Sequence, residues 1–197
     1  MSPGRRPDGR GKTPRPSIAE RLETGDLSRE EATEQAREYV LRSLTGAPRS
    51  RAQLTQALGR RGYPEELVEP LLDRMEEVGL VDDAAYADSL VRTRYAERGL
   101  SRRALAEELR RKGIDDDLAA DALGQVDDDD ERAAAADLVR RRLARTRGLD
   151  RDVRVRRTVA ALGRKGYGPG LAFELVRSEL ETEADELDGQ GVDDAGN

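Results

Sequence analysis

The side chains of this sequence best suited to chemistry are arginines. Between residues 140 and 165 there are eleven basic residues and two acids, so this segment carries +9 in a chain whose net charge is −6. Guanidinium groups bond phosphates and carboxylates through paired N–H donors. The segment therefore predicts contact with a polyanion or an acidic protein surface, and the alternative is an ordinary solvated helix face.

The residues between the arginines indicate how a nucleic acid would be contacted. A lesser basic cluster lies in residues 102–112, and in neither cluster are aromatic residues interleaved with the arginines. This pattern argues against a platform on which single-stranded bases stack. It favours contacts with a phosphate backbone or with protein over recognition of a particular base sequence.

Other chemistries are excluded or unsupported by the composition. The chain has no Cys and no His, which removes thiolate nucleophiles, the usual zinc sites and imidazole acid–base catalysis. The acidic run 127–131 lacks the spacing of a calcium loop and predicts the start of a helix. Gly9–Thr13 looks like the end of a phosphate-binding loop, but Arg6 stands where that motif needs its first glycine. We predict no catalytic residue, no cofactor and no metal site.

The elements that must position the arginines form an internal repeat. Three stretches align without gaps on Gly62, Gly113 and Gly166, each with a Leu four residues before the glycine and two basic residues just before it. Apolar residues return five, nine and ten positions after each glycine. A period of about 50 residues is typical of tandem repeats of one supersecondary unit.

Each repeat is predicted to contain three short helices. Apolar residues recur at helical spacing, Ser28 with Glu31 forms a capping box, and the glycines end helices in the left-handed conformation. We expect Asp82 or Asp83 to cap the first helix of the second repeat and Ser101 to cap its second. The third repeat is expected to have helices at about 130–147, 151–165 and 170–182. The fold class is all-α, an elongated array of three tandem three-helix repeats at 28–81, 82–127 and 128–182.

The two ends of the chain differ from the middle. Residues 1–27 begin with a basic, Pro/Gly-rich stretch, and residues 179–197 hold eight acids and no base. We predict disordered tails at 1–27 and 183–197. No apolar run is long enough to span a membrane, so we expect a cytoplasmic protein without a membrane partner.

Several motifs together resemble the RecX family of bacterial recombinase regulators. They are Arg49–Leu54 with Leu58 and Gly62, then Gly79–Ala87, then Gly99-Leu100 followed by Leu105, Leu109 and Lys112–Ile114, and lastly Lys165-Gly166-Tyr167. The resemblance covers about residues 32–181. It implies tandem three-helix repeats and a non-enzymatic protein that binds the RecA–DNA filament and inhibits RecA recombinase, ATPase and co-protease activity.

The family motifs do not fix contact residues, so we assign them from charge. The predicted partners are the RecA filament and single-stranded or duplex DNA through the phosphate backbone, bound by a monomer. The predicted basic face comprises Arg140, Arg141, Arg142, Arg145, Arg154, Arg156, Arg157, Arg164 and Lys165, with support from Arg110, Arg111 and Lys112.

Two other functions remain open at this point. Segments such as 50–78 have the rhythm of a helix-turn-helix, which favours a DNA-binding transcriptional regulator as the alternative. Against it, no repeat shows a distinct recognition helix. A carboxylate-dependent nuclease has only the abundance of acids in its favour.

Overall fold

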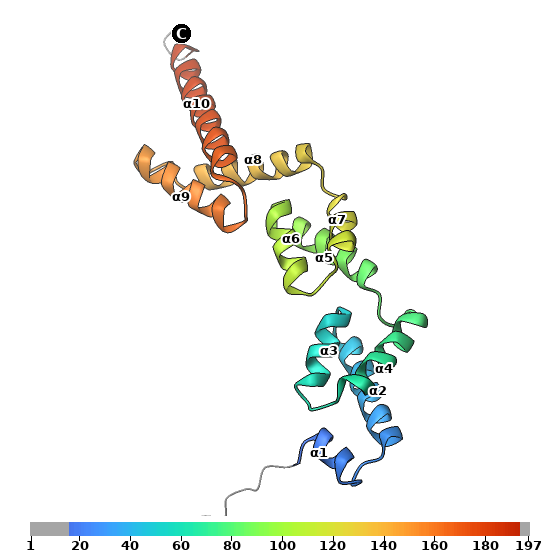
Figure 1. Ribbon diagram of the computed structural model, residues 1–197. Helices are drawn as coiled ribbons and strands as arrows, with labels where there is room; N and C mark the ends of the chain where they lie inside the picture. Colours follow the sequence, from blue (N-terminus) through green and yellow to red (C-terminus); the bar gives the residue numbers. More distant parts are fainter. Residues whose placement is uncertain (1–15, 194–197) are drawn as a thin grey trace, which may run out of the picture. The chain divides into compact units, whose positions relative to one another are not determined.

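The computed structural model describes the backbone of residues 16–193 and the side chains of residues 16–186. Every regular element in this range is a helix, from α1 to α10 (Figure 1). The predicted all-α class and the tandem three-helix repeats are confirmed. Residues 1–15 of the predicted N-terminal tail, including the Gly9–Thr13 stretch, and residues 194–197 of the predicted C-terminal tail lie outside the described residues.

The first of two compact units comprises described residues up to 48 together with 53–81. It contains α1 (Ile18–Glu23), α2 (Arg29–Gly46) and α4 (Glu65–Glu77), and most of α3 (Arg51–Gly59). Ser28 and Glu31 form the predicted capping box at the start of α2. A single apolar cluster holds these helices, and its buried members are Leu27, Ala32, Ala36, Val40, Leu54, Leu58, Leu67, Val68, Leu71, Leu72, Met75 and Val81.

Helix α1 was not expected, because the sequence analysis places residues 1–27 in a tail. Ser17 accepts a hydrogen bond from the Glu20 backbone N–H, and the Glu20 carboxylate accepts one from the Ser17 N–H, which completes a second capping box. Ile18 and Leu22 pack against the apolar cluster of the unit. Two helix signals, a cap and an apolar pair four residues apart, were therefore present in a stretch dominated by its basic composition.

The second unit comprises residues 49–52 and the described chain from 82 onward. Its first repeat has α5 (Asp83–Arg98), α6 (Arg102–Arg111) and α7 (Asp116–Leu123), and its second has α8 (Asp128–Ala144), α9 (Arg151–Arg164) and α10 (Pro169–Asp193). Each repeat has its own apolar cluster. Because aromatic residues are scarce, these cores are built mainly from Leu, Val and Ala, with Ile114 and Tyr167 as the buried exceptions.

The helix starts and stops of the second unit follow the predicted residues. Asp82 caps α5 by accepting from the Ala85 N–H, and Ser101 caps α6. Asp127 caps α8, so the acidic run is a helix start as predicted, and its charges lie at the positive end of the helix. Gly99 and Gly166 have φ of +55° and +92°, the left-handed conformation in which glycine avoids the Cβ clash.

Helix α10 is longer than expected, since the sequence analysis ends it at residue 182. Leu180 is buried in the cluster of this repeat, and Glu183 is held in an ion pair with Arg154. The Glu183 contact ties the helix to its neighbours beyond the point at which acidic composition suggested a tail. The backbone remains helical to Asp193.

None of the described helices combines the length and the apolar character needed to cross a lipid bilayer.

Candidate functional site

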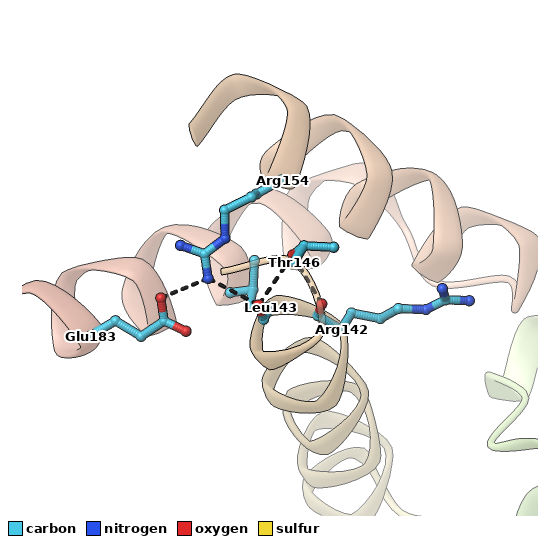
Figure 2. Close-up of polar contacts among 5 residues, drawn as sticks. All are labelled: Arg142, Leu143, Thr146, Arg154 and Glu183. Carbon is cyan, nitrogen blue, oxygen red and sulfur yellow. Dashed lines mark hydrogen bonds and ion pairs between the residues drawn. The ribbon is translucent and has the colours of Figure 1, made fainter. Parts of the chain in front are cut away.

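The three consecutive arginines of α8 do not share one face. Successive residues of an α-helix are rotated by about 100°. Arg140 forms an ion pair with Asp137 on its own helix, while Arg141 faces a groove against α5. The side chain of Arg142 extends away from the contacts between α8, α9 and α10 (Figure 2). Two of the three, Arg141 and Arg142, are close enough to Lys165 to act on its ionisation.

Arg154 is drawn into the protein and does not belong to an accessible basic face. Its guanidinium lies 2.7 Å from a Glu183 carboxylate oxygen and donates to the Leu143 carbonyl at 3.1 Å (Figure 2). Only 11% of its side chain is exposed. Its contacts join the end of α8 to α9 and α10. Arg154 is thus a structural residue of the third repeat.

The remaining predicted arginines of α8 and α9 are exposed but point in different directions. Arg157 and Arg164 are seven residues apart, which places them on the same side of α9. Arg156 instead borders a small apolar cavity with Phe173. Arg145 lies at the end of α8. The sequence grouped these side chains by proximity along the chain, and helix geometry separates them.

The supporting cluster Arg110, Arg111 and Lys112 lies at the end of α6. Cations there face the negative end of the helix dipole. Arg110 and Arg111 are exposed, whereas Lys112 is half-buried. The carbonyl of Lys112 accepts from the Ser50 hydroxyl at 2.5 Å, within the second unit. The turn at Lys112 therefore has a packing role in addition to its charge.

Lys165 is the centre of a group of four cations. Burial lowers the pKa of Lys165, and the charges of Arg141, Arg142 and Arg98 lower it further. Its ammonium donates to the carbonyl of Arg98 at the end of α5. We call Arg98, Arg141, Arg142 and Lys165 the junction cluster, because it brings together α5 of one repeat with α8 and the α9–α10 turn of the next.

The junction cluster borders a groove of about 460 Å³ between the end of α5 and α8. Arg98, Arg141 and Lys165 line it, together with the acids Glu97 and Asp137, and Asp137 is already paired with Arg140. Like charges held this close lose part of their repulsion when an anion binds between them. The groove therefore suits a phosphate or a carboxylate of a partner.

Hydrogen bonds to backbone carbonyls hold the two sides of the groove together. The N–H of Ser101 donates to the Lys165 carbonyl at 2.9 Å, and Arg103 donates to the Gly166 carbonyl at 3.0 Å. The Tyr167 hydroxyl donates to the Gly99 carbonyl at 3.1 Å. Burial raises the pKa of Tyr167 to about 12, with the charges of Glu131 and Tyr95 adding to the shift. The cations of the groove thus project from a fixed frame.

Sequence reasoning missed Arg98. It stands alone at the end of α5, outside both basic runs, and only the packing of consecutive repeats places it beside Lys165. A usable signal was present, because Arg98 directly precedes the helix-ending Gly99 just as Lys165 precedes Gly166. Among the described residues, no group of carboxylates is arranged to hold a metal ion.

The fold and this groove define a helical tandem-repeat protein that presents arginine and lysine side chains at its surface. Two domain families match the chain. The first three-helix domain of RecX matches residues 36–75, and the second three-helix domain of RecX matches residues 82–123. The chain belongs to the RecX family of regulatory proteins.

Individual relatives support this membership. Regulatory protein RecX of Thermobifida fusca is 52% identical over 164 residues, which cover 83% of this chain and 89% of that protein. Regulatory protein RecX of Streptomyces coelicolor is 49% identical over 171 residues, which cover 87% and 90%. A crystal structure of RecX from Lactobacillus salivarius has the same fold, with a TM-score of 0.66, 20% identity, and coverage of 76% of this chain and 97% of that one.

Proposed function

We propose that this protein is a non-enzymatic regulator that binds the RecA–DNA filament and inhibits the recombinase, ATPase and co-protease activities of RecA. Membership of the RecX family supports the regulatory role. The observation that carries the mode of binding is the junction cluster, in which Arg98, Arg141 and Lys165 from two repeats line one groove and Arg142 acts on the ionisation of Lys165. Acidic protein surface and DNA phosphate are both suitable ligands for such a grouping.

Within the predicted basic face, the proposed primary contacts are Arg141, Arg142 and Lys165, together with Arg98. Arg157, Arg164, Arg145, Arg110 and Arg111 are exposed and extend the cationic surface. Arg140 is secondary because it is paired with Asp137, Arg156 because it borders the apolar cavity, and Lys112 because it is half-buried. Arg154 is excluded because it is paired inside the protein. The protein acts as a cytoplasmic monomer, and light scattering of the purified chain tests its oligomeric state.

The test is ATP hydrolysis by RecA on single-stranded DNA with increasing amounts of the full chain. The wild type slows hydrolysis, and the double variant Arg98→Gln/Arg141→Gln needs at least about tenfold more protein, since each lost charged contact costs about 1–3 kcal/mol. The control, Arg92→Gln/Arg177→Gln, removes two exposed arginines of α5 and α10 that do not line the groove and keeps wild-type potency.

Two results overturn the proposal. Absence of any effect of the wild type on hydrolysis rejects the regulatory function. Equal loss of potency in both double variants rejects the junction cluster as the contact. Strong selection of one duplex sequence over random DNA at fixed salt favours the helix-turn-helix regulator instead.

A further inference from the structure

The first unit holds a second cationic feature, which combines arginines with aromatic rings. A cavity of about 410 Å³ opens against α2 and the turn that follows α3. Two tyrosines and two arginines line it, and the full lining is Gln35, Glu38, Tyr39, Arg42, Ser43, Arg61 and Tyr63. This combination is missing from the basic segments that the sequence analysis singled out.

Arg61 and Tyr39 form a stacked pair at this cavity. The central guanidinium carbon of Arg61 lies 4.0 Å from the centroid of the Tyr39 ring, which is a cation–π contact. The Tyr39 ring is held in place because it packs against the apolar cluster of the unit, as does the neighbouring Tyr63. A guanidinium plane held over a ring offers its outer face to another planar group, and nucleobases stack on such planes.

Positive charge surrounds the neighbouring Tyr63. Arg61 and Arg42 line the cavity with Tyr63, and burial raises the pKa of Tyr63 while the charges of Arg61, Arg21 and Arg42 oppose that rise. They come from α1, from α2 and from the turn after α3. Cations on separate elements around an aromatic pair match the successive phosphates of a strand more closely than the single phosphate group of one nucleotide.

The one acid of the cavity wall does not cancel this charge. Glu38 lies 3.5 Å from Arg42, and their side chains are 58% and 71% exposed. An exposed pair of this kind contributes little to stability and is screened by salt. An arriving phosphate can therefore replace the Glu38 carboxylate on Arg42 at little cost.

We propose that the first unit binds single-stranded nucleic acid at this tyrosine–arginine pocket. One base stacks on the Arg61–Tyr39 pair with Tyr63 as the neighbouring ring, and the flanking phosphates bond Arg42 and Arg21. The site is distinct from the junction cluster of the second unit, and the inference holds whether or not the protein inhibits RecA.

The experiment compares the binding of the full chain to an oligothymidine and to an abasic oligomer of equal length, followed by fluorescence anisotropy. The abasic strand keeps every phosphate and removes the stacking bases. The wild type binds oligothymidine at least about fivefold more tightly, the lower bound for one base stacked on an aromatic platform. Because the chain has no Trp, quenching of tyrosine fluorescence gives a second signal of binding close to the tyrosines.

Adjacent arginines provide a matched pair of variants. Arg61→Gln reduces the preference for oligothymidine to near unity, whereas Arg60→Gln, at an exposed residue outside the cavity wall, weakens both oligomers equally or not at all. Tyr63→Phe keeps the preference and Tyr63→Leu lowers it, which separates the ring from the hydroxyl. Circular dichroism checks that each variant remains folded.

Four results overturn the inference. Equal affinity of the wild type for the two oligomers removes base stacking. Equal effects of Arg61→Gln and Arg60→Gln on that preference would mean that general surface charge binds the oligomer and the pocket does not. Displacement of the oligomer by poly-glutamate as readily as by unlabelled oligothymidine assigns the pocket to acidic protein, and displacement by free thymidine monophosphate at micromolar concentration assigns it to a mononucleotide.

Discussion

The Ser101 backbone N–H donates to the Lys165 carbonyl over 2.9 Å, so the cap of α6 is bonded directly to the turn between α9 and α10. Next to this bond, a Cβ at Gly166 would lie 2.3 Å from the Ser101 hydroxyl and 3.1 Å from the Ala104 backbone N. Consecutive repeats of the second unit thus meet backbone to backbone. This contact sets the position of Lys165 beside Arg98 and hence the geometry of the groove.

Replacing Gly166 with Ala tests the closeness of this contact. Gly166→Ala adds both left-handed strain and a clash, and we expect it to lower the free energy of unfolding by about 3 kcal/mol or more. Gly99→Ala is the control, because Gly99 has φ of +55° and open space around its Cβ position, so it meets strain alone, about 1–2 kcal/mol. Urea unfolding measures both. Equal losses would show that the repeats are not in close contact at Gly166.

The Arg154–Glu183 pair predicts a large effect from a single neutralisation. Glu183→Gln leaves a guanidinium that is only 11% exposed without its carboxylate partner, and we expect a loss of about 3 kcal/mol. Glu181→Gln, two residues away and exposed, is the control and should change stability by less than about 0.5 kcal/mol. Thermal unfolding followed by circular dichroism measures both variants. Similar stability of the two would mean that the pair is not formed in solution.

Thr158 offers a stabilising substitution. Its hydroxyl is buried and has no hydrogen-bond partner among the described residues. Thr158→Val keeps the shape and removes the unsatisfied group, which should raise the free energy of unfolding by about 1 kcal/mol. Thr146→Val is the counterpart, because the Thr146 hydroxyl donates to the Arg142 carbonyl at 3.0 Å, and its loss should be neutral or destabilising. A drop in the melting temperature of Thr158→Val would indicate a hidden partner for the hydroxyl.

Tyr167 gives a dependence on alkaline pH. Its pKa is about 12 in the folded protein against a usual value near 10, so its contribution to stability is complete below pH 10 and is lost between pH 10 and 12. Over that range the wild type should lose about 1.4 kcal/mol per pH unit relative to Tyr167→Phe. Below pH 10 the wild type should be the more stable by about 1 kcal/mol, because the variant lacks the hydrogen bond to Gly99.

Paired urea titrations of wild type and Tyr167→Phe at several pH values from 8 to 11.5 measure this difference. The other tyrosines are common to both proteins, so their ionisation cancels. A difference in unfolding free energy that stays constant across this range would place the phenol in contact with solvent.

The sequence was most informative where the decisive interaction is local. The capping box at Ser28, the caps at Asp82 and Ser101 and the left-handed stop at Gly166 each depend on residues within one turn of the chain. Helix α1 shows how a local signal is lost, since its capping box at Ser17 lies beside a stretch whose basic, proline-rich composition dominated the interpretation.

The candidate site was only partly predictable, because it depends on which distant residues meet. Arg140, Arg141 and Arg142 are neighbours in sequence, yet the rotation of the helix separates them, and Arg154 is withdrawn by a carboxylate on α10. Arg98 joins Lys165 from another repeat, and Arg61, in the turn after α3, meets Tyr39 of α2.

The sequence by itself determined an all-helical chain of three glycine-punctuated repeats, its membership of the RecX family and its lack of thiol and imidazole chemistry. These follow from the periodic spacing of apolar residues, from composition and from contacts a few residues apart. The tertiary structure alone decided which cations are available to a partner and which are paired inside the fold. The density of charge along a chain does not specify the direction in which each side chain points. Only the packing of helices fixes the position of each guanidinium.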